Sequence, residues 1–556
     1  MDDRLPSLQT VHVPDDNNLK KTRTYFFYLM LCAGLIFLAG LGSRHLWNPD
    51  EPREAGIIAE MGRTGDRLVP RLNGEPFLEK PPLYYWVASS VFNLLKENSY
   101  TARLPSALAA ILGVALVFFL ARSMGFSAFS AFMAGFVLAT SAEYWSLGRR
   151  CLIDMMLCLF TTGAVVFFYK AVKDLPKRFL WYIAFVISLS CAVLTKGLVG
   201  IAVPISALFV WLVIEKRFDL KAWAFLLTGA VLCFIPFAIW LWLLYNRLGW
   251  DAIYEVVWTN NFGRFSGSHN SHINPFYYYI VNAPVQFLPW ILFLPMALVY
   301  HIREIQKKTT QFSSLFFMVW FIVPFLLLSI SEGKRGIYLL PLYPAAALFV
   351  GTAVGRFIEN EISPTKLFSI PAYILSWIIM AVSFGFCVVG LYYKQPFLIC
   401  MIISVPGLFL GIWAYQRLNR KDIFGFFKIT IAALIVLFIS FDTKITPIFN
   451  RFKSYEPLFD YCKKIAVEGS EIRLFDPKES YSGAAVFYMG RNIPVIDNKE
   501  SLKNFLHSGN NTVAICRGEI IKEVEHIDVV QTFHIGHRVV VLVRGKDFLS
   551  KDIKGA

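Results

Sequence analysis

Charged residues are scarce in this chain, and their scarcity excludes one large class of proteins. Asp, Glu, Lys and Arg together make up 17% of the 556 residues, whereas hydrophobic residues make up 56%. The mean hydropathy of +0.52 is too high for a soluble multidomain enzyme of this length. The composition therefore predicts a protein whose helices lie in a bilayer.

A continuous basic stripe is also missing, although the net charge is +15. Lys and Arg fall in short loops between apolar runs, which disfavours nucleic acid as a partner. The favoured interpretation is orientation in a membrane, with phosphate-bearing lipids as further partners. The 51 Phe, 24 Tyr and 14 Trp fit this interpretation, because aromatic rings gather where helices meet the membrane interface.

Metal-binding spacing is absent from the nine Cys residues, none of which has the close Cys and His neighbours of a structural zinc site. Seven of them lie in or beside apolar stretches, as small buried hydrophobic residues do. Cys462 and Cys516 lie in the polar C-terminal region, where a disulfide is an alternative. Internal repeats and Gly-rich phosphate loops are missing as well, which disfavours a repeat-built transporter and a nucleotide site.

Apolar runs of about 17 to 25 residues, long enough to span roughly 30 Å of hydrocarbon, occur thirteen times. A shorter run from Leu83 to Leu95 follows two prolines and is rich in Tyr and Trp, so we predict a helix lying in the interface. The thirteen predicted spans are 25–42, 104–121, 126–145, 152–169, 179–195, 198–214, 222–245, 284–301, 313–330, 337–354, 368–391, 397–416 and 424–441.

Basic residues predict how these spans are oriented. With thirteen spans and a cytoplasmic N-terminus, nearly every short cytoplasmic loop holds Lys or Arg, as the positive-inside rule requires. Counting Leu83 to Leu95 as a span would break this pattern and would separate Asp50 and Asp154 across the membrane. A cleaved signal peptide is the alternative for the first span, but the preceding region is long and contains four Asp residues, unlike a short basic leader.

Three parts of the chain are expected from this topology. Residues 1–24 form a cytoplasmic N-terminus, residues 25–441 a transmembrane domain, and residues 442–556 an outward domain. The last part alternates apolar and polar residues among polar helical segments, which is typical of a small α/β domain. The long outward loops of the transmembrane domain are 43–103 and 246–283. We therefore expect an all-α polytopic membrane protein of about 13 transmembrane helices with a small C-terminal α/β domain.

The first outward loop holds two clusters of charged residues. Asp50, Glu51 and Arg53 lie within four positions of one another after the first span. Glu79 and Lys80 follow later in the loop, where two prolines set a turn before the aromatic helix. A solvated charge cluster is the alternative interpretation. Two clusters in one loop beside the membrane favour a site.

Charged residues also lie at the ends of later spans. Arg149 and Asp154 flank the start of the fourth predicted span, where charged residues usually face a cavity or a partner. A simple helix N-terminal charge is the alternative for Asp154. Lys196 ends the fifth span before a glycine, and its alternative is an amine that only reaches up to the interface. The second outward loop contains His272, and a lone loop His is usually exposed to solvent.

Five motifs form one pattern: Asp50-Glu51-Pro52-Arg53, Glu79-Lys80-Pro81-Pro82, Arg149 with Asp154, Thr195-Lys196-Gly197, and Gly333-Lys334-Arg335 with Tyr338-Leu339-Leu340-Pro341. This pattern resembles the bacterial family of lipid A 4-amino-4-deoxy-L-arabinose transferases. That family belongs to a larger group of polytopic transferases that includes the protein O-mannosyltransferases. The resemblance covers most of the chain, and it is stronger for sugar transfer from a polyprenyl phosphate than for the particular sugar.

The resemblance implies a transferase that moves an aminosugar from undecaprenyl phosphate to a lipid A phosphate, at the periplasmic face of the bacterial inner membrane. Asp50 and Asp154 are then the candidate catalytic residues, with Asp50 positioning or deprotonating the acceptor. The other candidates would hold substrate, and they are the cations Arg53, Lys80, Lys196 and Lys334, which suit lipid phosphates, and Glu51, Arg149 and Tyr338.

A zinc ion shared by Glu79 and His272 is also implied by the resemblance. Two protein ligands are fewer than a closed zinc site needs, so such a metal is structural and weak, or is completed by water or substrate. No cofactor is required for the transfer itself, because the polyprenyl phosphate is already a good leaving group.

Several alternatives remain open at the level of the sequence. Two neighbouring carboxylates tend to raise one pKa, which suits a base, whereas an ionised phosphate acceptor needs only orientation. Glu54 departs from the family pattern, in which many members have Tyr, so the sugar is undetermined. Transfer to protein Ser or Thr hydroxyls is the second enzyme hypothesis. A membrane transporter is the least favoured function.

Overall fold

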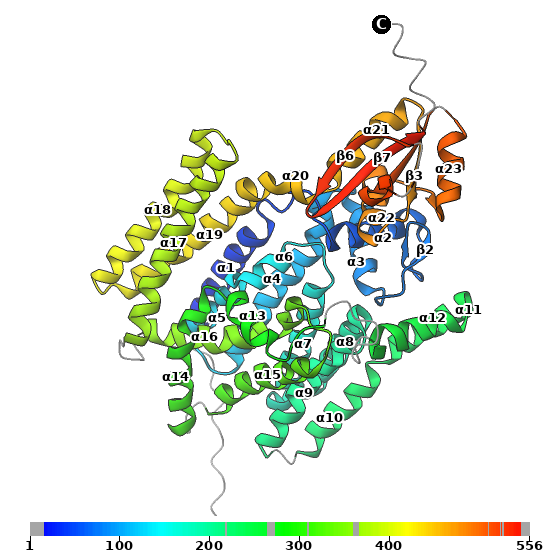
Figure 1. Ribbon diagram of the computed structural model, residues 1–556. Coiled ribbons are helices and arrows are strands. Elements are labelled where there is room, and N and C mark those ends of the chain that lie inside the picture. The colour runs from blue at the N-terminus through cyan, green and yellow to red at the C-terminus, as the bar shows by residue number, and fades with distance from the viewer. Residues whose placement is uncertain are drawn as a thin grey trace, which may run out of the picture.

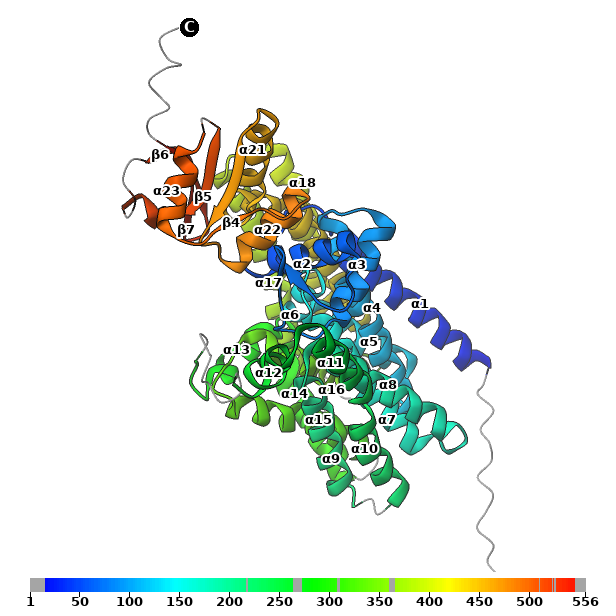
Figure 2. The ribbon, with the colours of Figure 1, turned by 90° about the vertical axis from the view of Figure 1, so that its right-hand side faces the viewer.

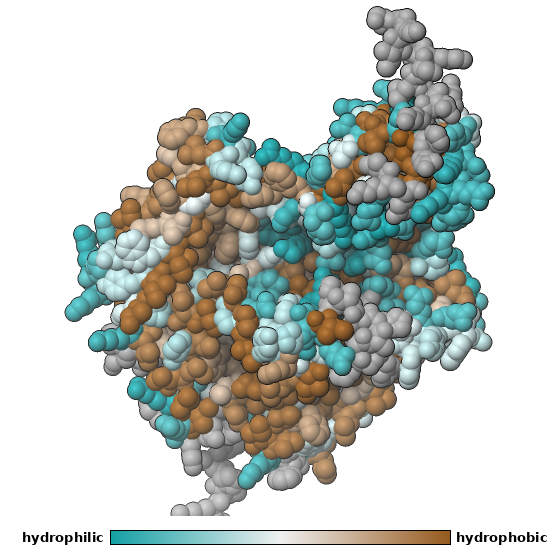
Figure 3. Space-filling view, in the orientation of Figure 1, coloured by the Kyte–Doolittle hydropathy of each residue, from teal (hydrophilic) through white to brown (hydrophobic). Residues whose placement is uncertain are grey.

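The computed structural model describes residues 16–216, 219–263, 273–307, 311–359, 366–509, 511–522, 524 and 527–545. Helices make up most of the structure, and a small sheet with its own helices lies at one end (Figures 1 and 2). Figure 3 shows hydrophobic side chains over much of the helical body and hydrophilic ones over the C-terminal region. This distribution fits a membrane-embedded body that supports a polar domain.

All thirteen predicted spans contain helix. Nine helical segments of the described residues are long and apolar enough to cross a membrane, and a tenth is the pair Tyr278–Gln286 and Trp290–Gln306, bent by 101°. The other three predicted spans are α1 (Asp16–Leu38), whose first turns are polar, and the shorter α5 (Ala128–Thr140) and α9 (Val199–Ile214). The chain is thus a multi-pass helical membrane protein, as predicted.

Helices that follow one another in the sequence also pack together, because their connections are short. Such pairs are α7 with α8 and α17 with α18, whereas α16 returns from far along the chain to pack on α5. The remaining helices of this region are α4 (Ser99–Ser123), α6 (Ala142–Gly148), α7 (Asp154–Lys173), α8 (Arg178–Lys196), α10 (Leu220–Leu232), α11 (Ile235–Leu248), α12 (Trp250–Tyr254), α13 (Tyr278–Gln286), α14 (Leu294–Lys307), α15 (Gln311–Ile330), α16 (Tyr343–Ile358), α17 (Lys366–Tyr392), α18 (Phe397–Asn419) and α19 (Ile423–Ser440).

The first outward loop is folded rather than extended. It contains α2 (Asp50–Thr64), a short hairpin of β1 (Arg71–Leu72) and β2 (Glu75–Pro76), and α3 (Leu83–Leu95). The helix predicted after the two prolines is therefore present with the expected bounds, and its place at the membrane interface stays a prediction. Tyr85 on α3 is fully buried, so one face of this helix packs on the loop.

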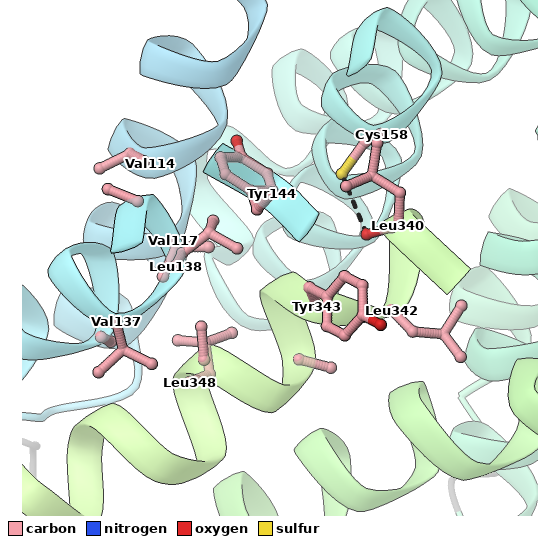
Figure 4. Packing of buried hydrophobic residues seen from close by; sticks show 14 of the residues in the cluster. Val114, Val117, Val137, Leu138, Tyr144, Cys158, Leu340, Leu342, Tyr343 and Leu348 are labelled. Carbon is pink, nitrogen blue, oxygen red and sulfur yellow. Dashed lines mark hydrogen bonds between the residues drawn. The ribbon is translucent and has the colours of Figure 1, made fainter. Parts of the chain in front are cut away.

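The short helix η4 (Gly336–Leu342) lies in the membrane-embedded core, and its packing positions Arg335, the residue that precedes it. This helix lies against α7, where the thiol of Cys158 donates a hydrogen bond of 3.4 Å to the Leu340 carbonyl (Figure 4). Buried side chains such as Leu342 and Tyr343 fill the space between η4, α5 and α16. The core thus fixes the start of η4 beside the start of α7.

The C-terminal region forms the predicted α/β domain. Its five strands are ordered β4-β3-β5-β7-β6, with β3 parallel to β4 and β5, and β7 antiparallel to β5 and β6. The helix of the last span continues with small irregularities as far as Lys453 before this domain begins. The end of that helix is α20 (Asn450–Lys453), and the elements after it are α21 (Glu456–Val467), β3 (Glu471–Phe475), α22 (Glu479–Met489), β4 (Val495–Ile496), α23 (Lys499–His507), β5 (Thr512–Arg517), β6 (Ile527–Ile535) and β7 (Arg538–Gly545).

The disulfide considered for this domain is not formed, because Cys462 and Cys516 are both buried free thiols. Cys462 on α21 packs in one apolar cluster with Ile515 of β5. Cys516 belongs to a different cluster, because successive residues of a strand point to opposite faces of the sheet. The sheet therefore separates the two sulfur atoms.

The C-terminal domain is docked on the first outward loop, with α22 lying against α2. Gly56 of α2 and Gly483 of α22 meet at the backbone, because a Cβ on Gly56 would lie 2.5 Å from the Cα of Gly483. Arg538 reinforces this contact by donating to the Asn48 side chain at 3.3 Å and to the Ser480 hydroxyl at 2.8 Å. These contacts with the C-terminal domain therefore fix the position of Asn48 and of the start of α2, where the first charged cluster lies.

We predict that Gly483→Ala destabilises the protein. Its Cβ would lie 2.4 Å from the Pro52 carbonyl oxygen and 2.5 Å from the Cα of Arg53, and overpacking of this kind costs about 1–3 kcal/mol. The thermal unfolding transition of the purified protein in detergent should fall. Gly385→Ala in α17 is the matched control, because nothing lies within 4 Å of its added Cβ. Equal transitions for the two variants would contradict the close contact.

Candidate active site

Asp50 is the first residue of α2, where a carboxylate is favoured by the helix dipole. One of its oxygens accepts a hydrogen bond of 2.8 Å from Arg335 Nη2, and the other lies 3.6 Å from Arg53 Nη2. Arg335 immediately precedes η4, so this ion pair joins the first outward loop to a segment 285 residues away. The side chain of Asp50 is 19% exposed, which leaves it accessible to a ligand.

The charges around Asp50 lower its pKa. Burial by itself raises the pKa of this carboxyl, but the guanidinium groups of Arg335 and Arg53 outweigh burial, and Arg150 adds to their effect. The net pKa lies below the usual value for Asp. The expectation that nearby carboxylates would raise it is wrong for Asp50, because cations from three different segments surround this carboxylate.

Asp154 forms a second carboxylate–cation pair. It is the first residue of α7, and it accepts a hydrogen bond from the ammonium of Lys196, the last residue of α8. The Lys196 ammonium also lies 4.8 Å from the centre of the Tyr338 ring, which is a favourable cation–π distance. Lys196 therefore makes specific contacts with two candidate site residues, more than an amine that only reaches to the interface requires.

Arg335 connects the two pairs. Asp50, Asp154 and Tyr338 each act electrostatically on its guanidinium, so all three lie in its neighbourhood. The structure thus brings Asp50, Asp154 and Tyr338 together in one place, as the motifs predicted. The arrangement offers carboxylates that can orient an acceptor and cations that can neutralise a phosphate.

Known proteins resemble this chain in sequence. A family model described as dolichyl-phosphate-mannose-protein mannosyltransferase matches residues 24–246. The undecaprenyl phosphate-alpha-4-amino-4-deoxy-L-arabinose arabinosyl transferase of Aeromonas salmonicida is 30% identical over 334 residues, which is 59% of each chain. The protein of the same name from Aeromonas hydrophila is 29% identical over 399 residues, covering 69% of this chain and 71% of that one. The chain is a homologue of these transferases.

Solved structures share the fold. ArnT from Cupriavidus metallidurans in the apo state has a TM-score of 0.74 at 20% identity, with 95% of this chain and 99% of that chain covered. The same protein bound to undecaprenyl phosphate gives a TM-score of 0.73, with 93% and 98% covered. The Archaeoglobus fulgidus oligosaccharyltransferase is more distant, with a TM-score of 0.52 at 11% identity. The chain therefore shares the fold of ArnT over nearly its whole length.

Glu51, which sequence reasoning placed among the substrate ligands, is buried in this arabinosyl transferase homologue. Its carboxylate accepts hydrogen bonds from Arg44 and from Arg103, the latter at 2.8 Å. It also accepts one from the backbone N–H of Trp47 and one from that of Cys151, each at 3.0 Å. Burial raises the pKa of Glu51, and the two guanidinium groups lower it far more, so the carboxylate stays ionised. Glu51 is therefore a positioning residue in the structure.

Arg149 is likewise engaged away from Asp50. Its guanidinium donates to the carbonyls of Ile36 and Ala39 at the end of α1, at 2.6 and 2.7 Å, and pairs with Asp442. Asp442 follows α19, so Arg149 joins the first and last spans. These contacts stabilise the helix ends and hold the Arg149 guanidinium beside Asp442 and the end of α1.

Lys334, which was predicted to hold substrate, is buried, and its neighbour Arg335 contacts Asp50. The Lys334 ammonium is buried and donates to the backbone carbonyls of Asn274 and Ser331, at 3.0 and 2.5 Å. Arg335 has an extended backbone, with φ −130° and ψ 143°. Consecutive side chains of an extended segment point to opposite sides, so burial of Lys334 directs Arg335 to Asp50.

Arg53 and the Glu79–Lys80 pair lie in partly buried positions. The Arg53 guanidinium contacts Glu54 at 2.7 Å and Glu479 of the C-terminal domain at 3.1 Å. Burial raises the pKa of Glu54, although Arg53 and the Tyr85 hydroxyl oppose that rise. Glu79 lies 3.9 Å from the Lys80 ammonium, which is 14% exposed.

The implied zinc pair of Glu79 and His272 stays a prediction. His272 lies outside the described residues, and within the described ranges no group of three His, Cys, Asp or Glu side chains could hold a metal. The Glu79 carboxylate lies near the ammonium of Lys80. We therefore derive no step through a metal.

Sequence reasoning missed Arg335 as a ligand of Asp50, and it chose Arg149 as a site residue rather than Arg150, which acts on Asp50. Both belong to motifs that were recognised, in each case next to the residue that was chosen. Side chains alternate in direction along an extended backbone, and this alternation could have indicated that Arg335 rather than Lys334 faces the site.

We predict that Glu51→Gln severely destabilises the protein. It removes the counter-charge of Arg44 and Arg103, both buried, and such a loss costs about 3–5 kcal/mol. The measurement is the thermal unfolding transition in detergent together with the yield of monodisperse protein. Asp50→Asn, at the neighbouring and more exposed position, should lower the transition far less. A Glu51→Gln variant as stable as the unmodified protein would contradict a positioning role.

Proposed function

We propose that the chain transfers 4-amino-4-deoxy-L-arabinose, or a related sugar, from undecaprenyl phosphate to a phosphate of lipid A. The site residues and the names of the relatives both support this activity. The single observation that carries it furthest is the ionised Asp50, whose pKa is lowered by surrounding cations at the mouth of the helical body. Such a site suits an acceptor and a leaving group that are both anionic.

In the proposed transfer, one bond forms and one bond breaks at the anomeric carbon. An ionised oxygen of the acceptor phosphate forms the new bond, while the bond between the anomeric carbon and the undecaprenyl phosphate oxygen breaks. The electron pair leaves with undecaprenyl phosphate, whose charge cations neutralise. No proton has to be removed from an ionised acceptor, so Asp50 is assigned to orientation.

Cations from several segments are available for the leaving phosphate. We assign Arg53, Lys80 and Lys196 to it, with Tyr338 beside Lys196. Lys196 would exchange part of its contact with Asp154 for the phosphate, which leaves Asp154 to orient the sugar. The aminosugar carries a positive charge, and carboxylates complement that charge.

The periplasmic side is proposed for this reaction. The basic residues of the opposite loops support a cytoplasmic location for those loops. The contacts of α2 with α22 support a common side for the first outward loop and residues 442–556. We place both in the periplasm, with residues 1–24 in the cytoplasm and the body in the inner membrane.

Transfer to protein Ser or Thr hydroxyls is the second candidate, and the family model over residues 24–246 is the observation that favours it. A hydroxyl must lose its proton, and a base works best with a pKa near the operating pH. The lowered pKa of Asp50 disfavours that chemistry. Mass spectrometry of lipid A from cells with and without the gene decides between the two acceptors.

We predict that Asp50→Asn abolishes sugar transfer and leaves the folded protein intact. Asn preserves the shape of the side chain but removes the charge that orients the acceptor. The measurement is transfer from the undecaprenyl phosphate donor to lipid A by purified protein, with thermal unfolding as the check on folding. Asp66→Asn in the same loop is the control. Full transfer by the Asp50→Asn variant would remove the proposed role.

We predict that the titration of Asp50 causes little change in the rate of transfer between pH 5 and 8. Its pKa is lowered from the usual Asp value of about 3.9 by the neighbouring guanidinium groups, so the ionised form persists as the pH falls through this range. Arg335→Gln removes a guanidinium that lowers this pKa and should move the acid limb of kcat/KM to higher pH. An acid limb that does not move in this variant would show that Asp50 does not control the rate.

A further inference from the structure

A second group of cations lies near Asp50 and is not used by the transfer described above. Arg150 acts electrostatically on Asp50. Arg150 and Arg44 both act on Lys453, which ends α20. Arg44 is paired with Glu51, so the two cations of this group without a carboxylate at ion-pair distance among the described residues are Arg150 and Lys453.

The backbone around Arg150 is tied to α2. The N–H of Cys151 donates to Glu51 at 3.0 Å, and Arg44 donates to the carbonyl of Arg149 at 3.0 Å. These bonds fix the residues on both sides of Arg150 beside the start of α2. The Arg150 side chain is partly exposed, and it makes no hydrogen bond or ion pair with any described residue.

Lys453 is held beside the same turn from the other end of the chain. Its carbonyl accepts a hydrogen bond of 2.9 Å from the N–H of Asn48. Its ammonium lies 4.6 Å from the centre of the Trp47 ring, and the Arg44 guanidinium lies 4.7 Å from the same centre. The indole N–H of Trp47 donates to Asn450 at 3.0 Å, which fixes the ring on which Lys453 rests.

The charges of Arg150 and Lys453 are not balanced by any carboxylate at ion-pair distance within the described parts of the chain. Both side chains are accessible to solvent, so a ligand can reach them. Neighbouring like charges repel, and a bound anion would relieve that repulsion. This is the opposite of Arg335 and Lys196, each of which already pairs with a carboxylate.

We propose that Arg150 and Lys453 form the site that binds the phosphate of the acceptor glycolipid beside Asp50. The ligand class is a phosphate monoester on the polar head of a lipid. This inference rests on the proposed transfer, and it adds the acceptor subsite to it.

The position of Lys453 favours the acceptor over the donor. It lies where the last helix meets the polar C-terminal domain, next to Asn48, which that domain also contacts. A saccharide head needs polar surroundings of this kind. The apolar carrier needs the spans, and Lys196 and Tyr338 lie at the ends of spans. The acceptor phosphate would then lie on one side of Asp50 and the phosphate of the leaving undecaprenyl phosphate on the other, with the transferred sugar between them.

The first test is kinetic. Lys453→Ala and Arg150→Gln should each raise the KM for bisphosphorylated lipid A about tenfold to a hundredfold, as loss of a charged hydrogen bond does. The KM for the undecaprenyl phosphate donor should stay within about twofold of the unmodified value, because that substrate is held elsewhere. A raised donor KM with an unchanged lipid A KM would overturn the assignment.

Arg451→Ala is the matched control. It removes the same charge two residues from Lys453, but its guanidinium rests on the rings of Tyr393 and Phe452, at 5.4 and 4.6 Å. This variant should leave both KM values unchanged. Lys453→Gln tests the same charge with a side chain of similar length, in case Lys453→Ala disturbs the packing on Trp47.

Direct binding without donor separates this inference from the proposed function. The unmodified protein in detergent should bind bisphosphorylated lipid A more tightly than fully dephosphorylated lipid A, and Lys453→Ala with Arg150→Gln should abolish the difference. Inorganic phosphate that competes as well as the lipid would overturn a lipid site, and an unchanged preference in the double variant would overturn the residues. Preferential binding without transfer of the sugar would contradict the proposed function and leave the phosphate site standing.

Discussion

The pairing of Glu51 with Arg44 and Arg103 is the constraint on which the candidate site depends. A buried carboxylate is tolerated only when its charge and its oxygens are satisfied, and here two guanidinium groups and two backbone N–H groups do so. These partners come from the end of the first span, from α4, and from the turn before α7. One side chain therefore fixes the mutual positions of three segments. Asp50 is adjacent to Glu51, so the contacts of Glu51 also fix the position of Asp50.

The charges around Asp50 divide into paired and unpaired groups, and this division suits a reaction between two anionic lipids. Arg335 and Lys196 are balanced by Asp50 and Asp154. Arg150 and Lys453 retain charge for a ligand. An enzyme that moves a sugar between phosphates must stabilise both of them without a nucleotide, and separated cation groups achieve this. The lowered pKa of Asp50 follows from the same cations and directs its role toward orientation.

The part of the C-terminal domain that follows Lys453 contributes to the site through its contacts with the first outward loop. Gly56 and Gly483 allow α2 and α22 to approach at the backbone, and Arg538 holds Asn48 two residues before Asp50. Glu479 of this domain also meets Arg53. Loops beside a membrane are usually mobile, so docking a folded domain on this loop reduces the entropy lost when substrates bind. The domain therefore preorganises the loop.

The sequence by itself determined the class of protein, the helical segments, the α/β domain and the motifs that hold Asp50, Asp154 and Lys196. Apolar length and basic loops are local signals, and they do not need the partner segments to be known. The roles of neighbouring charged residues were decided only by the tertiary structure. Glu51, Arg149 and Lys334 have the same residue types as ligands of substrate, yet each is engaged by groups from distant segments. Which of two adjacent cations faces the site depends on the direction of an extended backbone. Which carboxylate is buried depends on Arg44 and on Arg103, and Arg103 lies 52 residues from Glu51.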